Sequence, residues 1–165
     1  VAVLDGSEVV IIGRSGFEWR SVSGEAGRAS ARLMAYGLHL GARLPAHATS
    51  TGRVMLAALP KAELNQWVKS RLVAGSLPRL TAHTTTDARL FKASLEQVRS
   101  QDFCVASQEH ELGVHALAVP LRDGQGRTVA ALNVVTSPAR LEPLVLQQEL
   151  LPLLMDAARE LRELI

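Results

Sequence analysis

The segment from His47 to Gly52 contains residues whose types and spacing suit the binding of an anion. Thr49, Ser50 and Thr51 stand directly before a helix-forming run. The first turn of a helix has unpaired backbone N–H groups and a partial positive charge, and both attract an anion. The hydroxyls can add donors, and Gly52 lets a ligand approach the backbone closely. The pattern indicates a carboxylate site, with plain capping of the helix by Ser or Thr as the alternative.

Two polar residues in apolar strands are further candidates for ligand contacts. Asn133 lies in the apolar run 130–135, where a buried amide needs hydrogen-bond partners. A period of two places Asn133 on one face with Ala131 and Val135, and it either contacts a ligand or bonds to a neighbouring loop. His115 opens another apolar strand, where its imidazole is available to a phenol or a carboxylate.

A metal site is weighed at the histidines near this second strand. His110 and His115 are five residues apart in a stretch that contains Gly113, whereas a zinc-binding helix places its two histidines four residues apart. The other ligands considered are Glu109, Glu111, Cys104 and His47. Their spacing matches no known metal pattern, so we expect no metal ligand and no cofactor.

Catalytic patterns are weak throughout the sequence. His47 and Ser50 could act as base and nucleophile, but Ser50 is not in a G-x-S-x-G elbow and no orienting carboxylate can be assigned. Cys104 lies among apolar residues, which is typical of a buried small hydrophobe. The pair Gly124 and Gly126 belongs to a hairpin turn, not to a nucleotide-binding loop. We therefore expect no catalytic residues, with a small hydrolase or metal-dependent enzyme as the minor alternative.

The elements that must position these residues are strands followed by hairpins, with helices between and after them. The predicted strands are 1–4 and 8–12, which form a hairpin around Asp5-Gly6-Ser7, then 31–40, 103–106, 115–121 and 128–135, with a loop over 15–28 and a hairpin turn at 123–126. Because helices do not alternate regularly with strands, an antiparallel sheet with helices on its faces is predicted, which is an α+β fold.

Apolar periodicity predicts four helices. One covers 53–59, and Pro60 ends it and begins the next, whose Leu64, Trp67, Val68 and Leu72 share a face. Asp87 ends a cluster of hydroxyl residues that caps a third helix, with Ala88, Phe91, Leu95 and Val98 on one side. A long final helix opens at 142–143 and runs to Ile165, with Pro152 as a kink and an apolar side formed by Leu144, Leu151, Leu154, Ala158, Leu161 and Ile165.

Composition is that of one ordinary globular domain. The chain has 165 residues, of which 47% are hydrophobic and 21% charged, and a formal net charge of +2. No apolar run reaches the roughly 20 residues of a membrane-spanning helix, and a single cysteine fits a reducing cytoplasm. The arginines are scattered without a basic stripe, so we expect no direct contact with DNA. The chain starts inside a strand without an initiator methionine, so a fragment of a longer protein is expected.

From end to end, the order of these segments resembles the effector-binding domain of IclR-type transcription regulators. The matching pieces are 4–10, 41–59, 87–99, 109–120, 123–127, 129–133 and the leucine-rich final helix. The resemblance implies a GAF-like fold over 1–165, with an antiparallel sheet of about six strands flanked by helices. It also implies a homodimer or tetramer that contacts DNA only through an N-terminal winged helix-turn-helix domain, which is absent from this chain.

The resemblance also implies a ligand site. In this family small carboxylates are held by backbone amides at the position of Ser50 and Thr51 and by side chains of two later strands. Those later positions match Val114, Ala116, Asn133 and Val135. Where some relatives that bind two- or three-carbon acids have Cys and Ser, this chain has Ala116, Asn133 and Val135, so a pocket of different size and chemistry is implied.

Segments 43–50, 111–120 and 131–134 look most like the regulators of aromatic-acid catabolism that respond to 4-hydroxybenzoate or protocatechuate. The hypothesis is a benzoate with its carboxylate at Ser50 and Thr51 and its hydroxyl near His115 or Asn133, or the reverse. Its ring would contact Met34, Met55, Val114 and Ala116. The alternative partner of the carboxylate is Arg14 or Arg43, and the structural interpretation of Arg43 is a brace for the loop. A sensor of a small aliphatic acid, glyoxylate-like or pyruvate-like, is the alternative.

Overall fold

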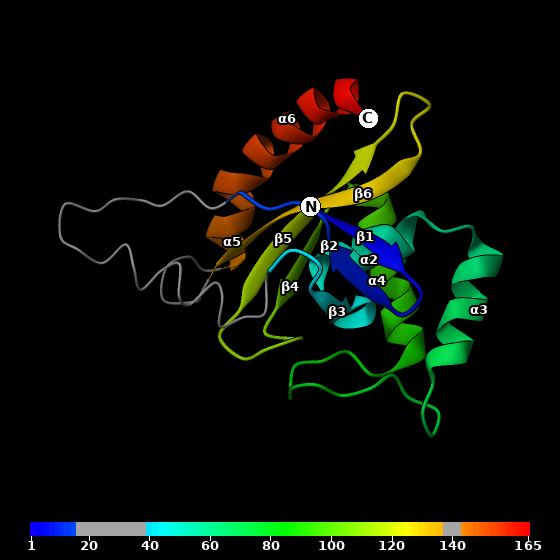
Figure 1. Ribbon diagram of the computed structural model, residues 1–165. Coiled ribbons are helices and arrows are strands. Elements are labelled where there is room, and N and C mark those ends of the chain that lie inside the picture. Colours follow the sequence, from blue (N-terminus) through cyan, green and yellow to red (C-terminus); the bar gives the residue numbers. More distant parts are fainter. Residues whose placement is uncertain (16–38, 137–142) are drawn as a thin grey trace.

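A computed structural model describes residues 1–15, 39–136 and 143–165 of the chain. Within them, six strands form one antiparallel sheet in the order β3-β2-β1-β6-β5-β4 (Figure 1). The strands are β1 (Ala2–Asp5), β2 (Glu8–Ile11), β3 (Arg43–Pro45), β4 (Cys104–Ser107), β5 (His115–Arg122) and β6 (Thr128–Thr136). The predicted α+β class, with an antiparallel sheet of about six strands, is confirmed.

The first three strands form one end of the sheet. The predicted hairpin of β1 and β2 is confirmed, with Gly6 at its turn at a φ of +62°, a left-handed conformation that suits glycine. Strand β3 was not predicted, because its three residues lie in a stretch with loop composition. Of the strand predicted at 31–40, residues 31–38 lie outside the described residues, and His39 and Leu40 form a bend and a turn. Most of the loop predicted at 15–28 also lies outside them.

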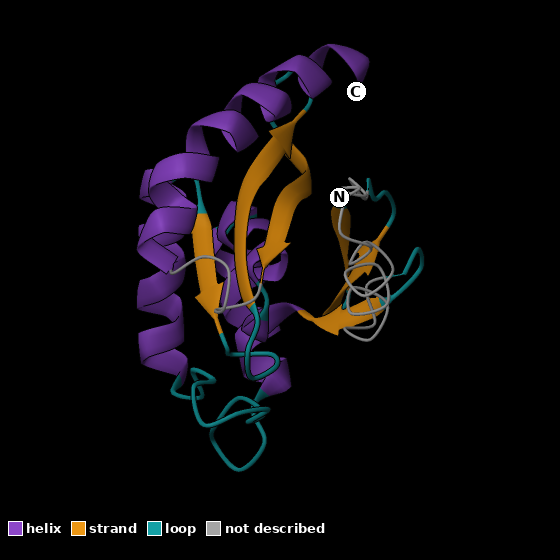
Figure 2. Cartoon of the chain, turned by 90° about the vertical axis from the view of Figure 1, so that its left-hand side faces the viewer, coloured by secondary structure: helices purple, strands orange, loops and turns teal. Residues whose placement is uncertain are grey.

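The last three strands form the other end. The predicted hairpin of β5 and β6 is confirmed, and the Asp123 carboxylate accepts the backbone N–H groups of Gln125 and Arg127 at 2.9 Å each. The two ends meet where Ala2 pairs with Ala131. Figure 2 shows the strands near the N-terminus turned away from the longer strands beside the C-terminal helix. The sheet therefore curls around the helices that cover its inner face.

Three helices build the core against this sheet. They are α2 (Ser50–Ala58), α3 (Lys61–Arg71) and α4 (Ala88–Gln101), and all three agree with the predicted helices to within a few residues. The predicted faces are confirmed: Leu64, Val68, Phe91, Leu95 and Val98 are buried. Together with residues such as Val54, Leu56, Ala118 and Ala131 they form one hydrophobic cluster. Helix α2 lies in the middle of the core.

The C-terminal helix is irregular near the predicted kink. A short α5 (Pro143–Val145) leads through a π-helical segment (Leu146–Leu150) into α6 (Leu151–Leu161) and a 3₁₀ turn (Arg162–Leu164). Pro152 has no N–H to donate, so the regular bonding pattern is interrupted in the turn before it. The predicted apolar face holds from Leu151 to Leu161, but Leu144 and Ile165 are exposed. None of the described helices is long and apolar enough to cross a membrane.

Candidate anion-binding pocket

A pocket of about 50 Å³ lies where the N-terminus of α2 meets strands β4, β5 and β6. Its lining includes seven of the predicted site residues, namely Thr49, Ser50, Thr51, Val114, Ala116, Asn133 and Val135. The other lining residues are Leu44, Ala48, Ala106, Glu109, His110 and Glu111. The structure therefore brings together the hydroxyl cluster before α2 and the two later strands, which are far apart in the sequence.

The start of α2 leaves amides available at this pocket. Thr49 is the residue that caps the helix, because its Oγ1 accepts the N–H of Gly52 at 3.2 Å. The same hydroxyl donates to the Pro45 carbonyl at 3.1 Å, so its capacity is used inside the protein. The backbone N–H of Arg53 bonds to the Thr49 carbonyl. By the geometry of a helix start, the amides of Ser50 and Thr51 have no acceptor inside α2.

The hydroxyls of Ser50 and Thr51 also remain unpaired. The two residues are only 1% and 5% exposed, and no other described residue hydrogen-bonds to either hydroxyl. Both residues line the pocket. Capping and anion binding are thus divided between neighbours: Thr49 caps the helix, while Ser50 and Thr51 keep free donors at its positive end.

Small residues on the strands make the space. Ala116 of β5 pairs across the sheet with Val135 of β6, and Ala118 pairs with Asn133. The predicted common face of Asn133 and Val135 is confirmed, because both residues line the pocket. The Asn133 amide, like the two hydroxyls, has no hydrogen-bond partner among the described residues. It is a donor and an acceptor at the edge of an apolar wall.

The loop between β4 and β5 brings acidic groups to the pocket. Glu109 forms a buried ion pair with Arg53 of α2, and the Glu109 carboxylate also accepts the N–H of Thr85 at 3.0 Å. The backbone carbonyl of Glu109 accepts the Thr84 hydroxyl at 2.7 Å. Arg53 Nε donates to the His47 carbonyl at 2.9 Å. The negative charge of Glu109 is therefore neutralised, and the loop is fixed to the first turns of α2.

Sequence reasoning did not find this ion pair. The sequence indicates Glu109 as a metal ligand, a surface residue or a ligand donor, and Arg53 as part of a helix. The available signal is Arg53, a charged residue directly before the apolar run 54–59. A charge in that place indicates a buried partner of opposite charge, but the sequence does not say which residue it is. In the described ranges, no group of three metal-ligating side chains comes together.

Two residues beside the pocket have shifted titration. Burial lowers the pKa of His110, and the neighbouring Glu111 carboxylate partly offsets that shift. Burial also lowers the pKa of His47, whose Nε2 lies 2.8 Å from the Pro78 carbonyl. The ring of His47 is therefore held by the loop before α4. This contact does not arrange His47 and Ser50 as a base and its nucleophile.

Three predicted site residues do not line the pocket, and their positions explain why. Gly52 is needed for packing, because a Cβ there would lie 2.1 Å from the Ala46 carbonyl oxygen. Met55 is buried in the hydrophobic core. His115 is 3% exposed and lies on the face of β5 opposite to Ala116, as alternation along a strand requires. Their contact with a ligand stays a prediction, which the lining of this pocket does not favour, and Met34 lies outside the described residues.

The alternative cationic partners also lie elsewhere. Arg43 forms ion pairs with Asp5 at 2.5 Å and with Glu8 at 2.8 Å, and its side chain is 47% exposed. It braces the β1–β2 hairpin, which agrees with the structural interpretation of that residue. Arg14 is exposed and does not line the pocket. Cys104 is buried, and burial raises the pKa of its thiol to about 12, so it stays a neutral thiol.

The curled antiparallel sheet of this chain, with helices on its inner face, is an α+β fold that matches the structures of effector-binding domains. The chain belongs to the family described as bacterial transcriptional regulator IclR, C-terminal, whose model matches residues 25–163. The predicted family is thereby confirmed. Since this is a family of transcriptional regulators, the expectation that the chain is not an enzyme is confirmed as well.

Individual relatives are similar over the whole chain. The p-hydroxybenzoate hydroxylase transcriptional activator of Acinetobacter baylyi is 42% identical over 165 residues, which are all of this chain and 56% of that protein. The Pca operon regulatory protein of the same organism is 44% identical over all of this chain and 55% of its own length. The chain thus spans about half the length of these relatives.

A solved structure agrees with the fold. The inducer-binding domain of the PobR transcription factor from Acinetobacter, a double mutant in complex with 3-hydroxybenzoic acid, superposes with a TM-score of 0.84 at 43% sequence identity. The match covers 99% of this chain and 86% of that one.

Proposed function

We propose that this chain is the effector-binding domain of a transcription regulator and that it binds an aromatic carboxylate such as 4-hydroxybenzoate or protocatechuate. The observation that carries the proposal is the pocket at the start of α2, where free amide and hydroxyl donors of Ser50 and Thr51 meet an apolar wall. The names of the relatives support it, since one refers to p-hydroxybenzoate and the solved domain holds 3-hydroxybenzoic acid.

In the proposed mode, the carboxylate accepts hydrogen bonds from the amides and hydroxyls of Ser50 and Thr51. The positive end of the α2 dipole favours the charge, as it does for anions at other helix starts. Val114, Ala116 and Val135 would contact the ring. Since Glu109 is paired with Arg53, it adds little repulsion against the ligand.

The phenolic hydroxyl would meet acceptors from two parts of the chain. One is the amide oxygen of Asn133, and the others are His110 and Glu111 in the β4–β5 loop. A phenol donates a hydrogen bond, whereas unsubstituted benzoate has no group to donate and would leave these acceptors unpaired. The hydroxyl is therefore expected to contribute to affinity. Of the two residues predicted as its partner, Asn133 lines the pocket and His115 does not.

The pocket volume supports a second candidate, a sensor of a small aliphatic acid. A volume of about 50 Å³ holds several waters or a two- to three-carbon acid more easily than a benzoate ring. A ring would require the lining side chains to move outward on binding. The relatives named for aromatic compounds favour the aromatic ligand, and a comparison of pyruvate with 4-hydroxybenzoate separates the two.

Calorimetric titration tests the ligand class. We expect saturable binding of 4-hydroxybenzoate, roughly tenfold weaker binding of benzoate because one hydrogen bond is lost, and no measurable heat with pyruvate. The ligand should be recovered unchanged. Tighter binding of pyruvate than of either benzoate would reject the aromatic class and favour the aliphatic one.

Substitutions at Ser50 test the predicted contact with the carboxylate. Ser50→Pro removes an amide donor at the first helical position, where proline is tolerated, and Thr49 before it is already extended with φ −118° and ψ 148°. We expect a loss of about tenfold or more in affinity, because hydrogen bonds to a charged group are strong. Ser50→Ala separates the hydroxyl from the amide.

Asn133→Leu should weaken 4-hydroxybenzoate by about tenfold but leave benzoate almost unchanged, since only the former has the hydroxyl. Asn65→Leu, on the exposed side of α3, is the matched control. Equal affinity of wild type, Ser50→Pro and Asn133→Leu, with all three folded, would reject this pocket as the binding site.

The remaining properties of the whole regulator extend the proposal. We infer that it acts in the cytoplasm as a homodimer or tetramer and contacts DNA through an N-terminal winged helix-turn-helix domain outside this chain. The length of the relatives supports a further domain, because each is nearly twice as long as the part matched here. Sedimentation of the full-length regulator, with and without 4-hydroxybenzoate, measures its assembly.

A further inference from the structure

A second concavity lies at the far end of strand β5, under the C-terminal helix. It has a volume of about 230 Å³, and an apolar part of its lining comes from Val119 and Pro120 of β5 and from Met155 and Ala158 of α6. We call it the arginine groove because Arg122, Arg159 and Arg162 also line it, with Asp102 as the one acidic residue. It shares no lining residue with the anion-binding pocket.

The groove concentrates positive charge. Three arginines against one aspartate leave an excess of two positive charges among eight lining residues, as large as the formal net charge of +2 of the entire chain. Arg122 holds Asp102 in a two-bond arrangement, with distances of 3.1 and 2.6 Å. This pair neutralises the aspartate, and Arg159 is itself paired with Asp156 outside the groove, so Arg162 contributes most of the charge that a ligand would meet.

Arg162 lacks a carboxylate partner in the part of the chain that the structure describes. Its Nε donates to the Asp123 carbonyl at 3.1 Å and its Nη2 to the Gly124 carbonyl at 3.5 Å. A guanidinium has five N–H groups, so three remain available. Arg159 is bonded to Asp156 through Nη1 only, at 2.7 Å, and its side chain is 75% exposed.

We propose that the arginine groove is a second binding site, for a small organic carboxylate with an apolar body. The free N–H groups of Arg159 and Arg162 would bind the carboxylate, a geometry for which guanidinium groups are well suited. The apolar lining would contact the apolar body of the ligand. Inorganic phosphate has no apolar body, so the groove is expected to bind it less well. Three arginines in one concavity do not form the extended basic stripe of a nucleic-acid surface.

Met155 provides a reporter for the arginine groove. Met155 lines the arginine groove, whereas Met55 lies in α2, whose first turn forms the anion-binding pocket.

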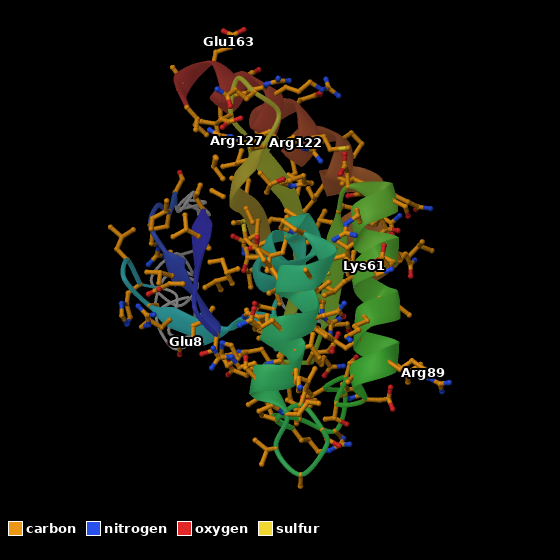
Figure 3. The ribbon with its side chains drawn as sticks, turned by 90° about the vertical axis from the view of Figure 1, so that its right-hand side faces the viewer. Glu8, Lys61, Arg89, Arg122, Arg127 and Glu163 are labelled. Atoms are coloured by element: carbon orange, nitrogen blue, oxygen red, sulfur yellow. The ribbon has the colours of Figure 1, made fainter. Side chains whose placement is uncertain are left out.

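Figure 3 shows Arg122 at the end of the sheet beneath the C-terminal helix, and Arg89 and Lys61 away from that helix. The chain therefore supplies two positive residues, both exposed, for a control variant with the same change of charge.

The experiment is a titration of the chain, labelled with ¹³C at its methionine methyl groups, with benzoate and with neutral benzamide. We expect the Met155 signal to shift saturably with benzoate and not with benzamide. In the double variant Arg159→Gln and Arg162→Gln the apparent Kd should rise roughly tenfold or more, since charge-assisted bonds are lost. The control variant Arg89→Gln and Lys61→Gln should match the wild type.

Failure of this proposal is distinguishable from failure of the proposed function. Ser50→Pro should weaken the calorimetric binding of 4-hydroxybenzoate at the anion-binding pocket and keep the Met155 response. The groove is rejected as a site if Met155 does not respond to benzoate, if benzamide produces the same shift, or if the double variant responds like the wild type. It is also rejected if the Met155 signal depends on protein concentration alone, which would make this face an interface between copies of the chain.

Discussion

Helices α2 and α6 both pack against strand β5, but they differ in how the fold holds them. Eight of the nine residues of α2 are buried, whereas none of the eleven residues of α6 is. In Figure 1 the two helices lie on different sides of the β5–β6 pair. The buried helix offers backbone groups at a fixed place, while the outer helix offers long side chains. A pocket that depends on amide positions therefore belongs with α2.

Charges on the two helices differ in the same way. The side chains of the Arg53–Glu109 pair are 6% and 11% exposed, and those of the Arg159–Asp156 pair are 75% and 59% exposed. Removing one partner of a buried pair leaves an uncompensated charge, which is costly, whereas a surface pair contributes little. The comparison predicts that equivalent substitutions have very different effects on stability.

The largest effect is expected for Arg53→Met. It should lower the free energy of unfolding by about 3–5 kcal/mol, because Glu109 stays buried without its cation. Arg159→Met in α6 should change it by less than about 0.5 kcal/mol. Urea unfolding of both variants measures the difference. Adding Glu109→Gln to Arg53→Met should recover part of the loss, and a cost below about 1 kcal/mol for Arg53→Met alone would contradict the role of the pair.

The second effect concerns the closest packing of α2. Gly52→Ala places a Cβ 2.1 Å from the carbonyl oxygen of Ala46, a backbone atom in a buried turn. Alanine gains about 1 kcal/mol in helix propensity, but the clash should cost about 3 kcal/mol, so a net loss of about 2 kcal/mol is expected. Gly124→Ala, with no atom within 4 Å of its Cβ, is the matched control. Equal melting temperatures for Gly52→Ala and Gly124→Ala would contradict the predicted clash at Ala46.

Local signals were sufficient to predict much of the region around these residues. The helix start at Thr49, the cap at Asp87 and the turn at Asp123 depend on side chains within a few residues of the backbone groups they bind. Asn133 and Val135 were placed on one face by alternation alone. The same alternation places His115 on the face opposite to Ala116, which lines the pocket.

The remaining features depend on contacts between distant segments. Arg53 and Glu109 are 56 residues apart, and no periodicity links them. Strand β3 is defined by its pairing with β2 and has no apolar alternation of its own. The close contact of Gly52 with Ala46 exists only after the chain folds back, so the sequence alone indicates ligand access as the role of this glycine. Sequence patterns predicted the elements of the pocket, and tertiary packing determined which side chains line it.

The smallest effect expected is a pH dependence of stability near α2. Burial lowers the pKa of His47 below its ordinary value of 6.5, and Arg53, Glu109 and His110 are the charged or titratable groups that act on it. As the pH falls below 6.5, the unfolded chain binds a proton before the folded chain does, so the free energy of unfolding decreases until the pH passes the folded pKa. Above pH 6.5 this contribution stays constant.

Below pH 6.5, the melting temperature of His47→Gln should therefore depend less on pH than that of the wild type. The substitution should also lower stability at every pH, because it weakens the hydrogen bond to the Pro78 carbonyl. His83→Gln, in an exposed loop, should retain the wild-type slope. Calorimetric melting of the three proteins over this pH range measures the slopes. If His47→Gln keeps the full wild-type slope, the proton that matters binds elsewhere, and His110, whose pKa burial also lowers, becomes the residue to replace.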